Sequence, residues 1–261
     1  MRDNKGFETN FDEFIETHYN SINRRINKIN INQIKEDRLY DIKRDMSKSY
    51  LYIAISKYSA GYNISSLESD LLSAIELCHE SWVDNAWKLK TRDGKVFNQY
   101  ILSAYDEMLW MLSLGYMLDI PNVEFEKLID VIDRDQIKDF LFEFIIKAKI
   151  PQRKLVEEES YKEDFGVPRV FEKLRKVLNE DDKSKAENLI KEFITKDWYK
   201  RHKGAGWADN HKSIHNVYFG YWSFGTAIVV CVKDLDDSSF RENKYYPKDL
   251  SDYCKRNCSS A

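Results

Sequence analysis

Apolar residues recur at intervals of three and four positions along most of this chain, and this spacing is what most limits its fold. The clearest stretch lies near the start and contains Phe11, Phe14, Ile15, His18, Tyr19, Ile22, Ile26 and Ile29. Such spacing is typical of helices with one face turned towards a core. Glycine and proline number only 9 and 4 in 261 residues, too few for the many tight turns of a sandwich or barrel. The sequence therefore predicts an all-α protein.

The same pattern predicts an array of antiparallel amphipathic helices, roughly eight to ten in number. We expect them over residues 11–29, 36–60, 65–89, 98–116, 123–132, 135–149, 169–179, 182–200 and 213–232. Gly61 is suited to end the second helix, and Asp93-Gly94 to form a turn after the third. No segment alternates as a strand does, and residues 157–168 are expected to form an acidic surface loop.

The chain divides best near Pro121, which follows the four long helices. We therefore expect an N-terminal helical domain over residues 1–120 and a C-terminal helical domain over residues 121–261.

Charge is distributed unevenly along the chain, although the formal net charge is only −3. Residues 58–135 contain fourteen acidic and only six basic side chains. A protein that binds nucleic acid needs the opposite excess, because phosphates attract cations. The sequence thus disfavours nucleic acid as the ligand and favours a basic protein surface.

The third expected helix concentrates this acidity on its outer side. Asp70, Glu76, Glu80 and Asp84 lie opposite its apolar residues, with no basic residue between Lys57 and Lys88. Asp106 and Glu107, on the following helix, add two more carboxylates. These six residues are the candidate partner-binding site, although a purely acidic helix face is also typical of ordinary solvent exposure.

Histidines and cysteines provide a weaker signal for metal binding. His211 and His215 have the spacing of two ligands on one helix face, and His202 lies nine residues before His211. The glutamate that a metalloprotease helix needs beside its first histidine is missing, and Cys254 and Cys258 lie in a polar tail. We predict no metal, no cofactor and no catalytic residues. A metal-dependent helical hydrolase built on His202, His211 and His215 remains an alternative, as does a general helical adaptor.

The four cysteines are scattered in a chain with enough apolar residues to form a core without disulfides, and no apolar leader follows Met1. We therefore expect a cytoplasmic protein. Residues 213–232 carry no formal charge and reach the length of a membrane span, but their polar side chains favour a buried helix. Trp222 and Phe224 are expected to be buried in it, and no membrane contact is predicted.

Two motifs in the C-terminal half resemble a known family. They are His211-Lys-Ser-Ile-His-Asn-Val-Tyr-Phe-Gly-Tyr-Trp-Ser-Phe224 and Asp236-Asp237-Ser-Ser-Phe-Arg241 with Asn243-Lys-Tyr-Tyr-Pro-Lys-Asp-Leu250. They are similar to the C-terminal domain of PoNi proteins, the immunity proteins against PoNe-type polymorphic DNase toxins of competing bacteria. Tyr58-Ser-Ala-Gly61, followed by an apolar and acidic helix, resembles the family's N-terminal domain. Gly225 stands where the family pattern has an acidic residue.

The resemblance implies an all-α, cytoplasmic, non-catalytic protein that binds and blocks the nuclease toxin made by its own cell. The charge pattern is compatible with this role, because a DNase presents a basic groove to DNA and an acidic surface can fill it. We expect the acidic helical surface to cover that groove, and we make no prediction about the oligomeric state.

Overall fold

The computed structural model is mainly α-helical and describes residues 1–3, 5, 9–83, 87–154, 156 and 167–258. The N-terminal half contains α1 (Phe11–Asn30), η1 (Glu36–Arg38), α2 (Leu39–Ala60), η2 (Ile64–Leu67), α3 (Glu68–Ser81), β1 (Lys88–Lys90), β2 (Val96–Tyr100), α4 (Leu102–Met117) and α5 (Asn122–Arg134). The C-terminal half contains α6 (Phe140–Lys149), α7 (Val167–Leu178), α8 (Lys183–Glu192), the π-helical η3 (Phe193–Asp197), α9 (Trp198–Arg201), η4 (Asn210–Lys212), α10 (Phe224–Val232) and α11 (Lys248–Cys258). The all-α prediction is confirmed.

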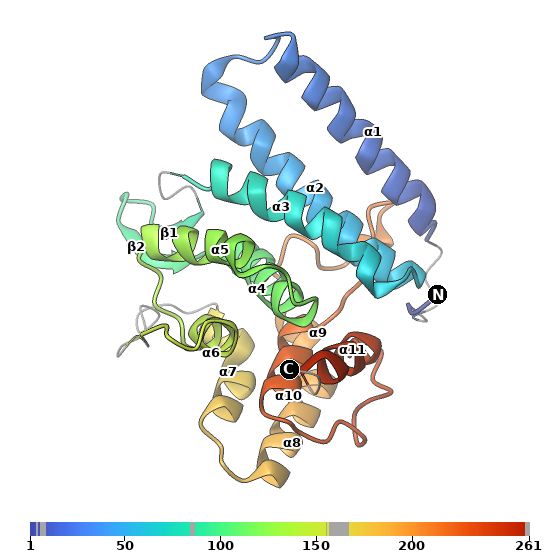
Figure 1. Ribbon diagram of the computed structural model, residues 1–261, viewed down its shortest axis with the longest axis vertical. Coiled ribbons are helices and arrows are strands. Elements are labelled where there is room, and N and C mark those ends of the chain that lie inside the picture. Colours follow the sequence, from blue (N-terminus) through green and yellow to red (C-terminus); the bar gives the residue numbers. More distant parts are fainter. Residues whose placement is uncertain (4, 6–8, 84–86, 155, 157–166, 259–261) are drawn as a thin grey trace.

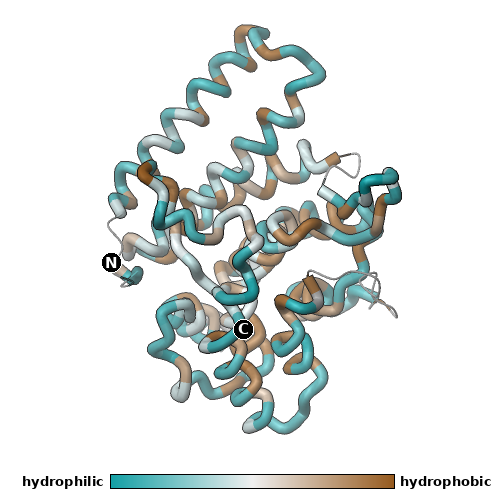
Figure 2. Tube along the Cα trace, turned by 180° about the vertical axis from the view of Figure 1, so that it is seen from behind, coloured by the Kyte–Doolittle hydropathy of each residue, from teal (hydrophilic) through white to brown (hydrophobic). Residues whose placement is uncertain are grey.

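Helices α1, α2 and α3 pack side by side in chain order, and α5 packs on α3 (Figure 1). The far ends of α1 and α2 project from the rest of the molecule at the top of this view. Polar and apolar residues alternate along the projecting pair, as expected for amphipathic helices (Figure 2). Gly61 ends α2 at φ 97°, the left-handed conformation that glycine adopts without strain.

A short hairpin replaces the end of the expected third helix and the start of the fourth. The chain leaves α3 at Ser81, and β1 pairs antiparallel with β2, with Lys88 opposite Tyr100. Asp93 and Gly94 lie in the turn between the strands, as predicted. Asn98, the first residue of the fourth expected helix, instead lies in β2, where its side-chain oxygen accepts a hydrogen bond from Lys88 at 3.0 Å.

Helix α4 forms the centre of the molecule. Thirteen of its 16 residues are buried, and it contacts α5 and α6 as well as α10 and α11. A single hydrophobic cluster therefore extends from Phe11 to Cys254 across both halves of the chain. The domain division at residue 120 remains a prediction.

The prediction of one long helix over residues 213–232 is wrong for the first half of this range. Only Phe224–Val232 is helical. Residues 213–217 are exposed, and residues 218–223 are buried in a non-helical segment that contains Gly220 at φ 120°. This backbone conformation interrupts a helix and is one that other residues rarely adopt. Trp222 and Phe224 are nevertheless buried, as predicted, with exposures of 4% and 1%. Within the described residues, no helix combines the length and the apolar character needed to cross a bilayer.

The expectation that the chain has no disulfide is also wrong. Cys231, at the end of α10, is bonded to Cys254 on α11, with 6.5 Å between their Cα atoms. Packing of α11 against α10 brings together two cysteines that are 23 residues apart. Cys78 is a free buried thiol, whereas the side chain of Cys258 and the acidic segment 157–166 lie outside the described residues.

Candidate functional site

Asp70, expected on an exposed acidic face, lies between three helices. Its carboxylate accepts hydrogen bonds from Tyr19 of α1 and Lys57 of α2, each at 2.5 Å. Lys57 also donates to the Tyr19 hydroxyl at 3.0 Å. A buried carboxylate needs such partners, because its desolvation is otherwise costly. Asp70 thus joins α1, α2 and α3 and is 3% exposed.

Glu107 is likewise internal, and its partners come from α2. Its carboxylate forms an ion pair with Arg44, and Lys48 lies 3.5 Å away. Tyr52 donates to the same carboxylate at 3.3 Å. Burial, followed by the nearby Glu107 charge, raises the pKa of Tyr52 well above its ordinary value. The Arg44 guanidinium lies 4.4 Å from the centre of the Trp82 ring, so the pair is enclosed by aromatic surface.

Asp106 connects α4 to the C-terminal half. Trp207 donates its indole N–H to Asp106 Oδ2 at 2.8 Å, and His202 Nε2 lies 3.2 Å from Oδ1. The other ring nitrogen of His202 lies 2.6 Å from the carbonyl oxygen of Trp198. Both imidazole nitrogens of His202 therefore lie close to oxygen atoms of other residues. His202 and Asp106 are completely buried.

The expectation of one exposed surface made of six carboxylates is therefore wrong for Asp70, Asp106 and Glu107. Glu76 and Glu80 do reach solvent from α3, with side-chain exposures of 47% and 40%. Asp84 lies outside the described residues. Sequence reasoning missed the cationic partners because they come from other helices.

Helix α5 extends the exposed acidity of α3. Lys127 of α5 contacts Glu76 of α3, and His79 of α3 lies 2.7 Å from Asp130 of α5. We call the surface formed by Glu76, Glu80, Glu124, Glu126 and Asp130 the α3–α5 acidic face.

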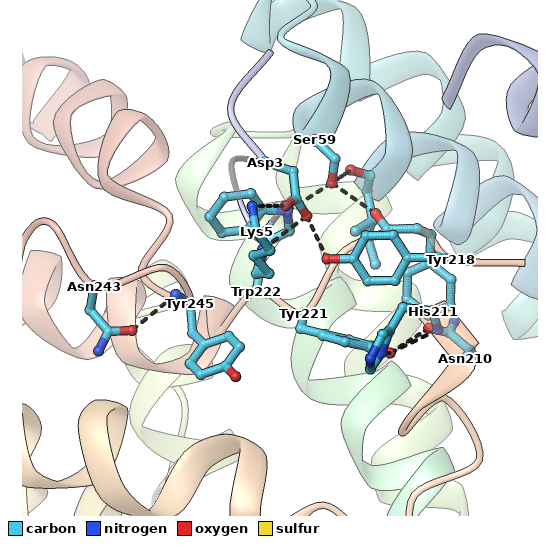
Figure 3. A network of polar contacts seen from close by, with 12 residues as sticks. Asp3, Lys5, Ser59, Asn210, His211, Tyr218, Tyr221, Trp222, Asn243 and Tyr245 are labelled. Carbon is cyan, nitrogen blue, oxygen red and sulfur yellow. Dashed lines mark hydrogen bonds and ion pairs between the residues drawn. The ribbon is translucent and has the colours of Figure 1, made fainter. Parts of the chain in front are cut away.

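The C-terminal motif forms the joint between the two halves (Figure 3). The Trp222 indole N–H donates to Ser59 Oγ of α2 at 2.8 Å, and Ser59 donates to the carbonyl of Phe219 at 2.8 Å. The Phe219 ring stacks on Tyr52 at a centroid distance of 4.1 Å. These contacts hold the non-helical segment against α2.

Residues near the N-terminus complete this joint. Tyr218 donates to Asp3 at 2.5 Å, and burial, followed by the Asp3 charge, raises the pKa of Tyr218 well above its ordinary value. Lys5 forms an ion pair with Asp3 at 2.8 Å and lies 4.0 Å from the centre of the Trp222 ring. Burial lowers the pKa of Lys5 although Asp3 opposes this effect. The polar sequence around Asp3 and Lys5 carried no signal that could have predicted this role.

The structure does not bring the three histidines of the hydrolase interpretation into one described site. His202 is hydrogen-bonded to Asp106 in the core, His211 Nδ1 lies 2.7 Å from the Tyr221 hydroxyl, and His215 is exposed. The described residues contain no group of three histidine, cysteine, aspartate or glutamate side chains placed to hold a metal ion.

Comparison with known families accounts for both halves of the chain. Residues 2–130 match the N-terminal part of the PoNe immunity proteins (PoNi), and residues 137–250 match the C-terminal part. The chain belongs to the PoNi family. Membership of the PoNi family indicates an immunity function and a toxin protein as the partner. Residues 210–223, which form the joint, lie within the C-terminal PoNi match.

Comparison with solved structures gives the same fold. Protein PA2201 from Pseudomonas aeruginosa is 14% identical, with a TM-score of 0.66, and the match covers 95% of this chain and 88% of that protein. No curated protein matches this chain.

Gly225, where the resemblance led us to expect an acidic residue, lies inside the core. A Cβ atom at this position would lie 3.0 Å from Cδ2 of Leu109 and 3.6 Å from Cδ2 of Leu174. Leucine side chains therefore fill the space that a larger side chain at position 225 would need.

Proposed function

We propose that this chain binds the toxin made by its own cell and blocks the DNase activity of that toxin. The observation that carries the proposal is the match of both halves to immunity proteins named for PoNe. We further propose that the α3–α5 acidic face covers the basic groove in which the nuclease holds DNA. A DNA-binding groove must attract phosphates, so an acidic protein surface can compete for it.

Exposure of the carboxylates supports this choice of surface. The side chains of Glu76, Glu80 and Asp130 are 47%, 40% and 58% exposed. Glu126 is exposed and forms no ion pair with any described residue. These groups can therefore contact a partner without unfolding any element of the chain.

The acidic face is partly neutralised by cations of the chain itself. Lys43 lies 2.9 Å from Glu80, and Lys127 contacts both Glu76 and Glu124. These pairs offset the repulsion between Glu76 and Glu80, which lie four residues apart on one helix. Each carboxylate has further lone pairs, so an arginine or lysine of the toxin can share it with the internal cation.

The proposal is tested by removing charge from this face without changing its shape. We expect the variant Glu76→Gln/Glu80→Gln/Glu126→Gln to bind the purified nuclease domain about tenfold more slowly at low salt, because electrostatic steering of association weakens. The dependence of the association rate on salt should become shallower. Surface binding kinetics at several salt concentrations measure both effects, and a DNA-cleavage assay measures protection.

A matched control removes the same charge elsewhere. Glu36, Asp37 and Asp181 are exposed and form no ion pair with any described residue. The variant Glu36→Gln/Asp37→Asn/Asp181→Asn should bind like the wild-type protein. If both triple variants bind equally fast, the α3–α5 acidic face is not the interface. If the wild-type protein does not bind the nuclease, the proposed function is wrong.

A further inference from the structure

The loop at residues 210–217 is held in one conformation by hydrogen bonds at its base (Figure 3). Asn210 Nδ2 donates to the carbonyl of Val217 at 2.8 Å and closes the neck of the loop. The hydroxyl of Tyr221 lies 2.7 Å from Asn210 Oδ1, and it accepts from the backbone N–H of His211 at 3.1 Å. Tyr221 is buried, so the core itself fixes this base.

A second attachment joins the loop to α1. Asn216 Nδ2 donates to the carbonyl of Asn10 at 2.8 Å. The Asn10 side chain in turn accepts from the backbone N–H of Glu13 and caps α1. The loop is therefore anchored on both the core and the first turn of α1.

This ordered loop exposes apolar side chains to solvent. Ile214 is 95% exposed, more than any other large apolar side chain in the described parts of the chain. Val217 is 41% exposed, whereas the next residue along the chain, Tyr218, is buried. An apolar side chain on an already ordered loop favours association, because little conformational entropy remains to be lost on binding.

The surroundings of Ile214 are acidic on the side of α1. Ile214 and Glu13 line an open hollow of about 410 Å³ between the loop and the start of α1. Glu13 and Glu16 are exposed and form no ion pair with any described residue, and Asp12 accepts a hydrogen bond from Tyr62 at 2.8 Å. The surface thus combines an apolar apex with acidic side chains on the side of α1, whereas Lys212 of the loop forms an ion pair with Asp209 at 3.0 Å.

We propose that Ile214 and the first turns of α1 form a second contact for the cognate toxin, outside the α3–α5 acidic face. The complementary surface is an apolar depression bordered by arginine or lysine side chains, because interfaces combine a buried apolar anchor with a charged rim. This inference rests on the proposed function, which supplies the toxin as the partner. The loop provides the apolar anchor, and the α3–α5 acidic face accelerates association.

The test replaces the anchor with a charged residue. We expect Ile214→Asp to weaken binding to the purified nuclease domain about thirtyfold or more, mainly through faster dissociation, as for an interface hot spot. Asn210→Ala removes the hydrogen bond that closes the neck of the loop but keeps the Ile214 side chain. It should therefore weaken binding by a smaller factor than Ile214→Asp does. Binding kinetics measure both variants, and circular dichroism checks that they are folded.

Ile31→Asp is the matched control, because Ile31 is 62% exposed at the end of α1 and the substitution is chemically the same. It should bind within about twofold of the wild-type protein, as expected for a side chain outside the interface. If Ile214→Asp binds like the wild-type protein while the α3–α5 charge variant is weakened, this inference is overturned and the proposed function stands. If Ile31→Asp weakens binding as much as Ile214→Asp, the loop is not a specific contact. If the wild-type protein does not bind, both fail.

Discussion

Replacing Gly220 with alanine should destabilise the joint between the two halves of the protein. Gly220 has φ 120°, and a Cβ atom there would lie 2.4 Å from Ser59 Oγ and 2.6 Å from Trp222 Nε1. Cβ atoms essentially never lie so close to other atoms, so the side chains of Ser59 and Trp222 would have to move away from the added Cβ. The hydrogen bond between them, 2.8 Å long and buried, would then be lost.

The expected cost has two parts. The unfavourable backbone conformation contributes about 1–2 kcal/mol for a residue with a Cβ atom. A buried N–H left without its acceptor contributes about 1–3 kcal/mol. Their sum is about 2–5 kcal/mol, a large fraction of the 5–15 kcal/mol by which a typical folded protein is stable. For a chain of this size, the midpoint of thermal unfolding should fall by about 10 °C.

Urea and thermal unfolding, followed by circular dichroism, measure this loss. Gly94→Ala is the control, because Gly94 has φ 89° with no atom within 4 Å of the added Cβ. It should cost only the backbone part, about 1 kcal/mol. In a Ser59→Ala background, Gly220→Ala should cost less, because one of the clashing atoms is gone. If Gly220→Ala were no more destabilising than Gly94→Ala, the close approach at the joint would be refuted.

Two further predictions concern covalent and ionisable groups. The double variant Cys231→Ser/Cys254→Ser should lower the free energy of unfolding by about 3 kcal/mol, because the disulfide restricts the unfolded chain across 23 residues. An unchanged urea midpoint under oxidising conditions would contradict this prediction. Burial, followed by the charge of Arg25, lowers the pKa of His18 from 6.5. The folded state therefore binds fewer protons than the unfolded state, so stability should fall as the pH drops below about 6.5. His18→Gln should make urea midpoints at pH 7 and pH 5 differ less than in the wild-type protein, and an equal difference would refute the role of His18.

The long helices could be predicted because their signals are local. The apolar spacing from Phe11 onwards gave α1 its limits to within a residue, and Gly61 ends α2 as expected. A helical period depends only on neighbouring turns, so the chain carries this information within short segments.

The candidate site was less predictable because burial is not a local property. Asp70 and Glu76 lie on the same helix and have similar charges, yet Asp70 meets Lys57 and Tyr19 in the interior while Glu76 reaches solvent. Glu107 is neutralised by Arg44, which is 63 residues away in the sequence. A count of charges along the chain cannot distinguish these environments, because the cations that pay for burial come from other helices.

The sequence by itself determined the helical class, the apolar faces and the polar turns, because these follow from spacing and backbone preference. Only the tertiary structure decided that residues 213–223 are not helical and that residues 218–223 pack against α2, although the uncharged composition of this segment also suits a helix. The Ser59 hydroxyl and the stacking of Tyr52 on Phe219 stabilise the non-helical conformation there. Packing likewise brought Cys231 to Cys254 and left Ile214 in solvent. Each outcome depends on contacts between distant segments, whose free energy exceeds the small local preferences of the residues involved.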